Sequence, residues 1–292
     1  MISFDSIIVR TGYYNHNDRF YLLNKNGEII NYSVLREHKS NDSNDYKYFY
    51  YYLKSNHFIN NTYFTAVSIP YRLDKHLNRD EEDELNTIEQ RKSPLFVKVQ
   101  LFNPNSKREF FIYEFYKEIG EDSDYVSNDF ELTLDADNNR MLVISRWSDK
   151  LFVINLNTMK LTKTITLKSN YSEIGTKPIS NKSTHSHKIQ TYIAAGCTNG
   201  GIEQIYFDKF KHLYYVVIRH NADTNIIDKS QAWSLHILDK DFHKLQEIPF
   251  AAKEYDLYGT FLIVKQGILI PKMNNQDEEK PVYTLFSVNY SN

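Results

Sequence analysis

Basic side chains recur at one point of a repeated sequence pattern. Short apolar or aromatic runs, YLLNK, SIPYR, VISR, VVIR and LIPK, each close on a lysine or arginine, at Lys25, Arg72, Arg146, Arg219 and Lys272. We call these residues the strand-end cations. Lysine and arginine hold carboxylates and phosphates through charge-assisted hydrogen bonds. If the runs are equivalent strands of one closed structure, the cations would gather on one face and focus a positive potential there. The pattern therefore predicts a site for a small anion or an acidic glycan.

Two observations bear on the chemistry of this predicted site. Trp147 follows one strand-end cation directly, and Trp233 lies near another. An indole beside an arginine could stack on a sugar ring, and the alternative is that both tryptophans pack between strands. The cations have an alternative role as well, because they could pair with acids on the adjacent blade, such as Asp129, Glu131 or Glu203, and tie blades together.

Metal and nucleophile chemistry finds weaker support in the sequence. His185 and His187, in STHSH, offer two imidazoles at a spacing of two, and solvated loop histidines are the alternative. No Gly-x-Ser-x-Gly elbow, His-Glu-x-x-His helix or glycine-rich phosphate loop is present. Asp135 and Asp208 recur at equivalent places, but an aspartate directly after a strand usually caps the turn. We therefore expect no bound metal and no cofactor.

The elements that would position the cations are clearest in residues 129–169. Four strand-like runs, Glu131–Asp135, Arg140–Ser145, Leu151–Asn155 and Leu161–Leu167, are separated by turns rich in Asp, Asn and Ser. The middle runs are almost continuously apolar, as expected where neighbouring sheets cover both faces, and the last run alternates. This meander predicts one four-stranded antiparallel propeller blade.

The same pattern returns later in the chain. Arg146 follows Asp135 by eleven residues and Arg219 follows Asp208 by eleven, with RMLVIS and LYYVVI between them. Repeats of this length built from short strands are typical of propellers. We predict an all-β fold, a single β-propeller over 1–292 with five or six blades, six being preferred, and we expect an incomplete N-terminal beginning. The polar segments 73–93 and 170–188 are predicted as inserted loops on one face.

Composition excludes several classes of protein. The chain has 35 Lys and Arg against 37 Asp and Glu, so its near-neutral balance gives no reason to expect nucleic acid. Cys197 is the single cysteine, which excludes an intramolecular disulfide and thiolate metal clusters. No run of about 18 apolar residues is present, so we expect no membrane span, and the oligomeric state is not predicted.

The blade sequence VISRWSDKLFVINL and the closing run PVYTLFSVN resemble the uncharacterised six-bladed propeller lipoproteins of Bacteroidetes, one of the domain-of-unknown-function families. The resemblance covers most of the chain. Members of that group usually begin with a lipoprotein signal that ends in a cysteine, and this chain begins without one. The resemblance implies a location in the cell envelope, in the periplasm or on the outer surface, whereas the chain as it stands reads as cytoplasmic. It brings no established activity or catalytic residue.

These observations together predict a noncatalytic binding or scaffold propeller. Its partner would be a small anionic ligand, a glycan or an acidic protein segment, bound at the loop-rich face around the strand-end cations. The alternative is a propeller hydrolase or lyase that acts on an anionic sugar.

Overall fold

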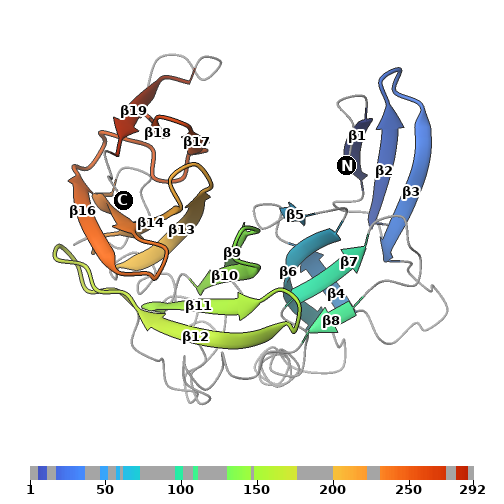
Figure 1. The fold of residues 1–292 in the computed structure, drawn as a ribbon, viewed down its shortest axis with the longest axis horizontal. Helices are drawn as coiled ribbons and strands as arrows, with labels where there is room; N and C mark the ends of the chain where they lie inside the picture. Colours follow the sequence, from blue (N-terminus) through green and yellow to red (C-terminus); the bar gives the residue numbers. More distant parts are fainter. Residues whose placement is uncertain are drawn as a thin grey trace. The chain divides into compact units, whose positions relative to one another are not determined.

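The structure is a computed structural model, and its strands are drawn in Figure 1. The residues that it describes are 6–11, 18–36, 47–51, 57–59, 62–72, 96–100, 108–110, 130–145, 148–175, 200–221, 231–273 and 281–288. The chain divides into two compact units, Met1–Tyr113 and Glu114–Asn292, each of which is described by itself.

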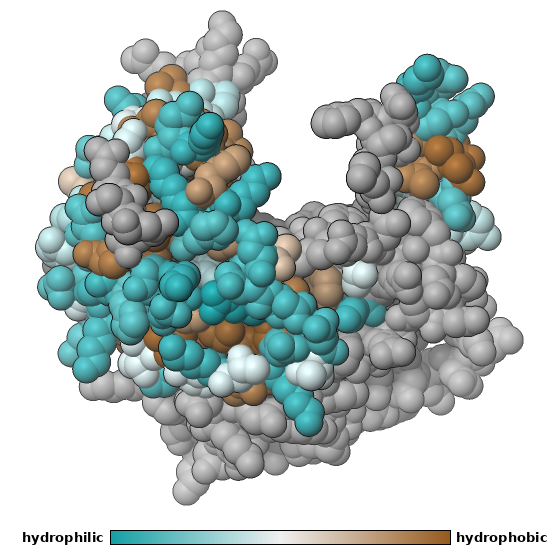
Figure 2. Space-filling model, in the orientation of Figure 1, coloured by the Kyte–Doolittle hydropathy of each residue, from teal (hydrophilic) through white to brown (hydrophobic). Residues whose placement is uncertain are grey.

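The described residues of the first unit form two antiparallel sheets. One is a hairpin meander of β1 (Ser6–Thr11), β2 (Asp18–Asn24) and β3 (Ile29–Arg36). The second joins β4 (Lys47–Tyr51), β6 (Thr62–Arg72), β7 (Phe96–Gln100) and β8 (Arg108–Phe110), and β5 (His57–Ile59) also pairs with β6. In Figure 2 hydrophobic colour gathers over the β2–β3 hairpin, where Ile29 and Ile30 are 60% and 56% exposed.

In the second unit, the part of the chain that the structure describes forms three antiparallel meanders. The first consists of β9 (Phe130–Asp135), β10 (Arg140–Ser145), β11 (Lys150–Asn155) and β12 (Lys160–Thr166). The next consists of β13 (Gly201–Asp208), β14 (Leu213–Arg219), β15 (Trp233–Leu238) and β16 (Lys244–Phe250). The last has β17 (Leu262–Val264), β18 (Gly267–Pro271) and β19 (Tyr283–Ser287). Two successive four-stranded meanders of this kind are propeller blades.

Short polar side chains close the turns of these blades. Asp135 Oδ1 accepts a hydrogen bond from the Asn138 backbone N–H at 3.1 Å, and Asp208 Oδ1 accepts one from Phe210 at 2.9 Å. Both aspartates are fully buried. The predicted capping role of the two aspartates is confirmed. Asn155 and Asp239 cap the turns after the third strands in the same way.

The cores lie between sheets. Because side chains alternate along a strand, β14 sends Tyr214, Val216 and Ile218 towards the β9–β12 sheet. Its intervening residues, such as Tyr215 and Val217, pack with residues of the segment 255–270. A strand buried on both faces explains the continuous run LYYVVI. The outer strand β12 is largely exposed, as its alternating sequence predicted.

The predicted all-β class and the four-stranded antiparallel sheets are confirmed by the described residues. The blade count and the single domain over 1–292 remain predictions. Residues 73–93 and 176–188, most of the predicted inserted loops, lie outside the described residues. In the part of the chain that the structure describes, no helix has the length and apolarity needed to cross a bilayer.

Candidate functional site

The strand-end cations occupy equivalent places in their sheets. Lys25 lies in the turn after β2, Arg72 ends β6, Arg219 ends β14 and Lys272 follows β18. Each of these strands is the second along the chain in its main meander. Lys25 and Lys272 are exposed, and Arg146 lies outside the described residues. The equivalent placement was visible in the sequence, and the gathering of these residues into one ring remains a prediction.

Arg219 is held inside the second unit by a carboxylate of its own sheet. Its Nε lies 2.7 Å from Glu203 Oε1, and the two side chains are only 4% and 3% exposed. The pairing of β13 with β14 is irregular between Ile202 and Gln204, which leaves Glu203 as the extra residue of a bulge. This ion pair neutralises the Arg219 charge within the sheet.

Trp233 is a packing residue in the described structure. It pairs with Arg219 in register as the first residue of β15 and is fully buried. Its ring stacks on Phe250 with 4.1 Å between centroids and lies 5.6 Å from Phe261. An indole in this position contributes to the core rather than presenting a face to a sugar. The other tryptophan candidate, Trp147, and the histidines His185 and His187 lie outside the described residues.

A buried polar cluster, which the sequence did not reveal, joins the same blade to the chain that precedes it. His236 Nε2 lies 3.0 Å from Glu247 Oε1, and the side chains are 0% and 2% exposed. Glu247 also accepts hydrogen bonds from Ser234 Oγ at 3.1 Å and from the Asn170 backbone N–H at 3.0 Å. Lys244 Nζ lies 2.8 Å from Glu247 Oε2. The cluster ties the segment after β12 to β15 and β16.

Burial sets the protonation of this cluster. It lowers the pKa of His236 and the pKa of His220, the residue that directly follows β14. The negative charge of Glu247 opposes this lowering only in part. Burial alone would raise the pKa of Glu247, but hydrogen bonds from Lys244, Ser169 and the Asn170 backbone, together with His236, lower it to about 2. The folded protein therefore favours neutral histidines beside an ionised glutamate.

We expect acid to weaken the fold through this cluster. The unfolded histidines bind protons near pH 6.5 whereas the buried ones resist protonation, so stability is full above that pH and falls below it. Each histidine lowers the free energy of unfolding by up to about 1.4 kcal/mol per pH unit in this range. The stability that ionised Glu247 contributes is lost in turn as the pH falls from 4.5 towards its folded-state pKa of about 2. Urea unfolding at a series of pH values measures this slope.

The variant His236→Gln provides the control, because glutamine does not titrate. Its stability should depend less on pH between about 6.5 and 5 than that of the wild-type protein. An unchanged slope in the variant would show that His236 contributes nothing to the acid response.

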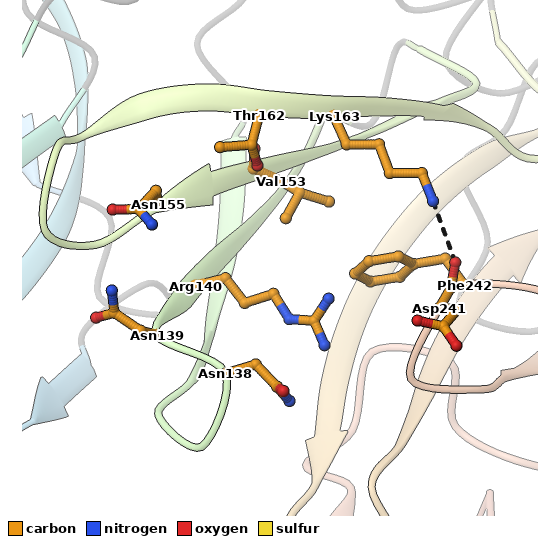
Figure 3. A pocket seen from close by; sticks show the side chains of 9 residues that line it. All are labelled: Asn138, Asn139, Arg140, Val153, Asn155, Thr162, Lys163, Asp241 and Phe242. Carbon is orange, nitrogen blue, oxygen red and sulfur yellow. Dashed lines mark hydrogen bonds between the residues drawn. The ribbon is translucent and has the colours of Figure 1, made fainter.

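An open pocket lies between the β9–β12 and β13–β16 sheets (Figure 3). It is at the strand ends opposite those that carry the strand-end cations. Its volume is about 300 Å³. Arg140 reaches into it from the start of β10, with Nε 2.9 Å from Asp135 Oδ2 and Nη2 donating to the Lys240 carbonyl at 3.0 Å. Its guanidinium carbon lies 4.9 Å from the centroid of the Phe242 ring. Arg140 is thus fixed by charge, hydrogen bonding and stacking.

Lys163 enters the same pocket from β12. Its Nζ donates to the Asp241 carbonyl at 3.2 Å and lies 5.5 Å from the Phe242 ring centroid. Phe242 takes a left-handed backbone conformation, with φ at 72°, at the β15–β16 turn, and its ring stacks on Tyr214 at 4.8 Å. One aromatic ring therefore has two cations over it. We name the cavity the Arg140 pocket.

A signal for this pocket was present in the sequence as a departure from the repeat. Arg140 pairs with Asp135 across the first turn of its blade, and Leu213 takes the equivalent place opposite Asp208. An arginine where the sister blade has leucine indicates a local role. Lys163 and the Asp241–Phe242 turn gave no such signal, because only the packing of two sheets brings them near Arg140.

Within the described ranges, no three or more His, Cys, Asp or Glu side chains are placed to hold a metal ion.

Comparisons with known proteins bear on the fold. No family model and no curated protein matches the sequence. Among solved structures, a DUF4221 family member from Bacteroides vulgatus matches with a TM-score of 0.64 and 17% identity, over 97% of this chain and 76% of that one. The chain is similar in fold to an uncharacterised Bacteroides family. The resemblance to such a family in Bacteroidetes is thereby confirmed, and at this identity the likeness to the DUF4221 member concerns the fold alone.

Weaker structural matches were also found. A protein of unknown function from Bacteroides caccae matches with a TM-score of 0.36 and 10% identity, over 84% of this chain and 63% of that one. An endo-arabinase from Bacteroides thetaiotaomicron matches with a TM-score of 0.39 and 12% identity, over 98% and 94%. Scores this low carry no argument about activity.

Proposed function

We propose that this protein is a noncatalytic binding propeller that recognises an anionic ligand at the strand-end cations. The observation that carries the proposal is the repeated placement of a basic residue at or just after the end of the second strand of a sheet, at Lys25, Arg72, Arg219 and Lys272. A rigid sheet scaffold with variable connections is a common platform for recognition. Cations that recur at equivalent ends would attract a carboxylate, a phosphate or an acidic glycan.

The described side chains divide the cations into two roles within this proposal. Lys25 and Lys272 are exposed and no ion pair is recorded for either among the described residues, so their ammonium groups can meet a ligand. Arg219 forms an ion pair with Glu203, and in this proposal the pair holds the end of the sheet in place. We therefore propose Lys25, Lys272, Arg72 and Arg146 as ligand contacts.

The acid–base pair His236 and Glu247 is better suited to stabilising the fold than to catalysis, because it is buried. A hydrolase or lyase needs a general acid or base that a substrate can reach. His236 and Glu247 are 0% and 2% exposed. This pair therefore serves the fold in our proposal.

A thermal-shift screen of the whole chain against anionic glycans and metabolites tests the proposed function. We expect at least one anionic compound to raise the melting temperature, and Lys272→Ala and Arg146→Ala to reduce that rise. Removing one charge-assisted hydrogen bond should weaken binding by about tenfold. The matched control is Lys265→Ala, since Lys265 is exposed in the β17–β18 turn at the other end of the same sheet as Lys272.

Two results would count against this proposal. One is a shift that stays the same in Lys272→Ala and in Arg146→Ala. The other is an equal loss in the Lys265→Ala control, which would indicate a general charge effect rather than a site.

A further inference from the structure

We propose that the Arg140 pocket is a second ligand site, which binds a small, singly charged and hydroxyl-rich anion of the sugar-acid class. The site goes beyond the proposed function and does not depend on it. The pocket lies at the Asp135 and Asp239 turns of the second unit, whereas the strand-end cations follow the other ends of the strands.

The negative group of the ligand is assigned to Lys163 and Arg140. Lys163 Nζ has a backbone carbonyl as its partner rather than a carboxylate, so its charge has no counterion among the described residues. Arg140 is partly neutralised by Asp135 from the buried side, but the structure gives its Nη1 atom no partner among the described residues. A carboxylate in the pocket would receive one ammonium and one guanidinium donor.

Pre-organisation adds to the case for binding. The guanidinium of Arg140 is held by Asp135, by the Lys240 carbonyl and by the Phe242 ring before any ligand arrives. A donor that is already ordered loses little conformational freedom on binding. Long arginines on open surfaces lack this restraint, which distinguishes the pocket from scattered surface charge.

The hydroxyl groups of the ligand are assigned to amide and carboxylate side chains. Asn155 Oδ1 accepts hydrogen bonds from the Asn157 and Thr158 backbone, each at 3.0 Å, and this fixes the amide while Nδ2 keeps its donor capacity. Asn139 lines the same wall (Figure 3), and its side chain makes no recorded hydrogen bond within the described structure. The Asp241 carboxylate, which also lines the pocket, is an acceptor for hydroxyl protons.

Charge and size restrict the class further. The charged side chains that line the pocket are Arg140, Lys163 and Asp241, and Asp135 pairs with Arg140 from behind, so Lys163 is the cation that a single negative group would balance. A volume of about 300 Å³ lies at the lower end of the range for small-molecule sites, so the occupant is a small molecule rather than a polymer. A hexuronate combines one carboxylate with several hydroxyl groups at this size.

Isothermal titration of the whole chain with sodium glucuronate tests the inference, with glucose and inorganic phosphate as comparison ligands. Lys163→Ala should weaken glucuronate binding by about tenfold or more. Asn155→Asp should do the same, because it removes a donor and adds a negative charge. Aspartate is compatible with that turn, since Asp239 caps the equivalent turn of the next blade at 2.9 Å. Lys160→Ala is the matched control, since Lys160 is exposed on the same strand and does not line the pocket.

The expected result is glucuronate binding that exceeds glucose and phosphate binding, falls in Lys163→Ala and Asn155→Asp, and is unchanged in Lys160→Ala. No binding of glucuronate to the wild-type chain would overturn the proposal, and so would binding that neither pocket variant changes. Phosphate binding as tight as glucuronate binding would overturn the assignment to sugar acids. These variants leave the strand-end cations intact, so failure here is distinct from failure of the proposed function.

Discussion

Replacing Arg219 with alanine is expected to lower the free energy of unfolding by about 3–5 kcal/mol, the range for removing one partner of a buried ion pair. Glu203, which is 3% exposed, would lose the Arg219 Nε that lies 2.7 Å from its Oε1. The Coulomb energy lost is only part of the effect, because the Glu203 carboxylate would lose a charge-assisted hydrogen bond in a place from which water is largely excluded.

Equilibrium urea unfolding of the wild-type protein and the variant measures this change. The double variant Arg219→Met with Glu203→Gln is the control, since it removes both charges and should be less destabilised than Arg219→Ala alone. A loss below about 1 kcal/mol in Arg219→Ala would be typical of an exposed pair and would contradict the buried role.

Trp233→Ala is expected to produce a loss of similar size, about 3–5 kcal/mol, because it opens a large cavity in a closed core. The indole is fully buried and stacks on Phe250 at 4.1 Å between ring centroids. Phe261 borders the same space, so the surrounding rings are too large to collapse into it without moving their strands.

Thermal and urea unfolding of Trp233→Ala and Trp233→Phe separate packing from hydrogen bonding. The structure gives Trp233 Nε1 no hydrogen-bond partner among the described residues, so phenylalanine removes volume without breaking a bond. Trp233→Phe should therefore lose much less stability than Trp233→Ala. Near-native stability of Trp233→Ala, together with weakened ligand binding, would instead indicate a contact residue.

Local chemistry explains what could be predicted from the sequence. The turns after β9 and β13 were predictable because Asp135 and Asp208 bond to backbone groups only two or three residues away. The strand positions followed from short apolar runs between such turns. The shared position of the strand-end cations followed from the same repeat, since equivalent strands end at equivalent places.

The environments of these side chains could not be predicted in this way. Arg219 was identified as a strand end, but its burial depends on the bulge at Glu203, for which the sequence of β13 gives no signal. The Arg140 pocket requires Lys240 to lie against a residue 100 positions away. Glu247 bonds to Asn170 across 77 positions. Contacts between sheets set these sites, and short motifs do not encode such contacts.

The most direct measurement of the central claim is a crystal structure of the whole chain with the anionic ligand that gives the largest thermal shift. We expect the acidic group of this ligand to lie within hydrogen-bonding distance of a strand-end cation, with Lys272 Nζ as the first candidate. An acidic group bound away from all the strand-end cations would contradict the claim.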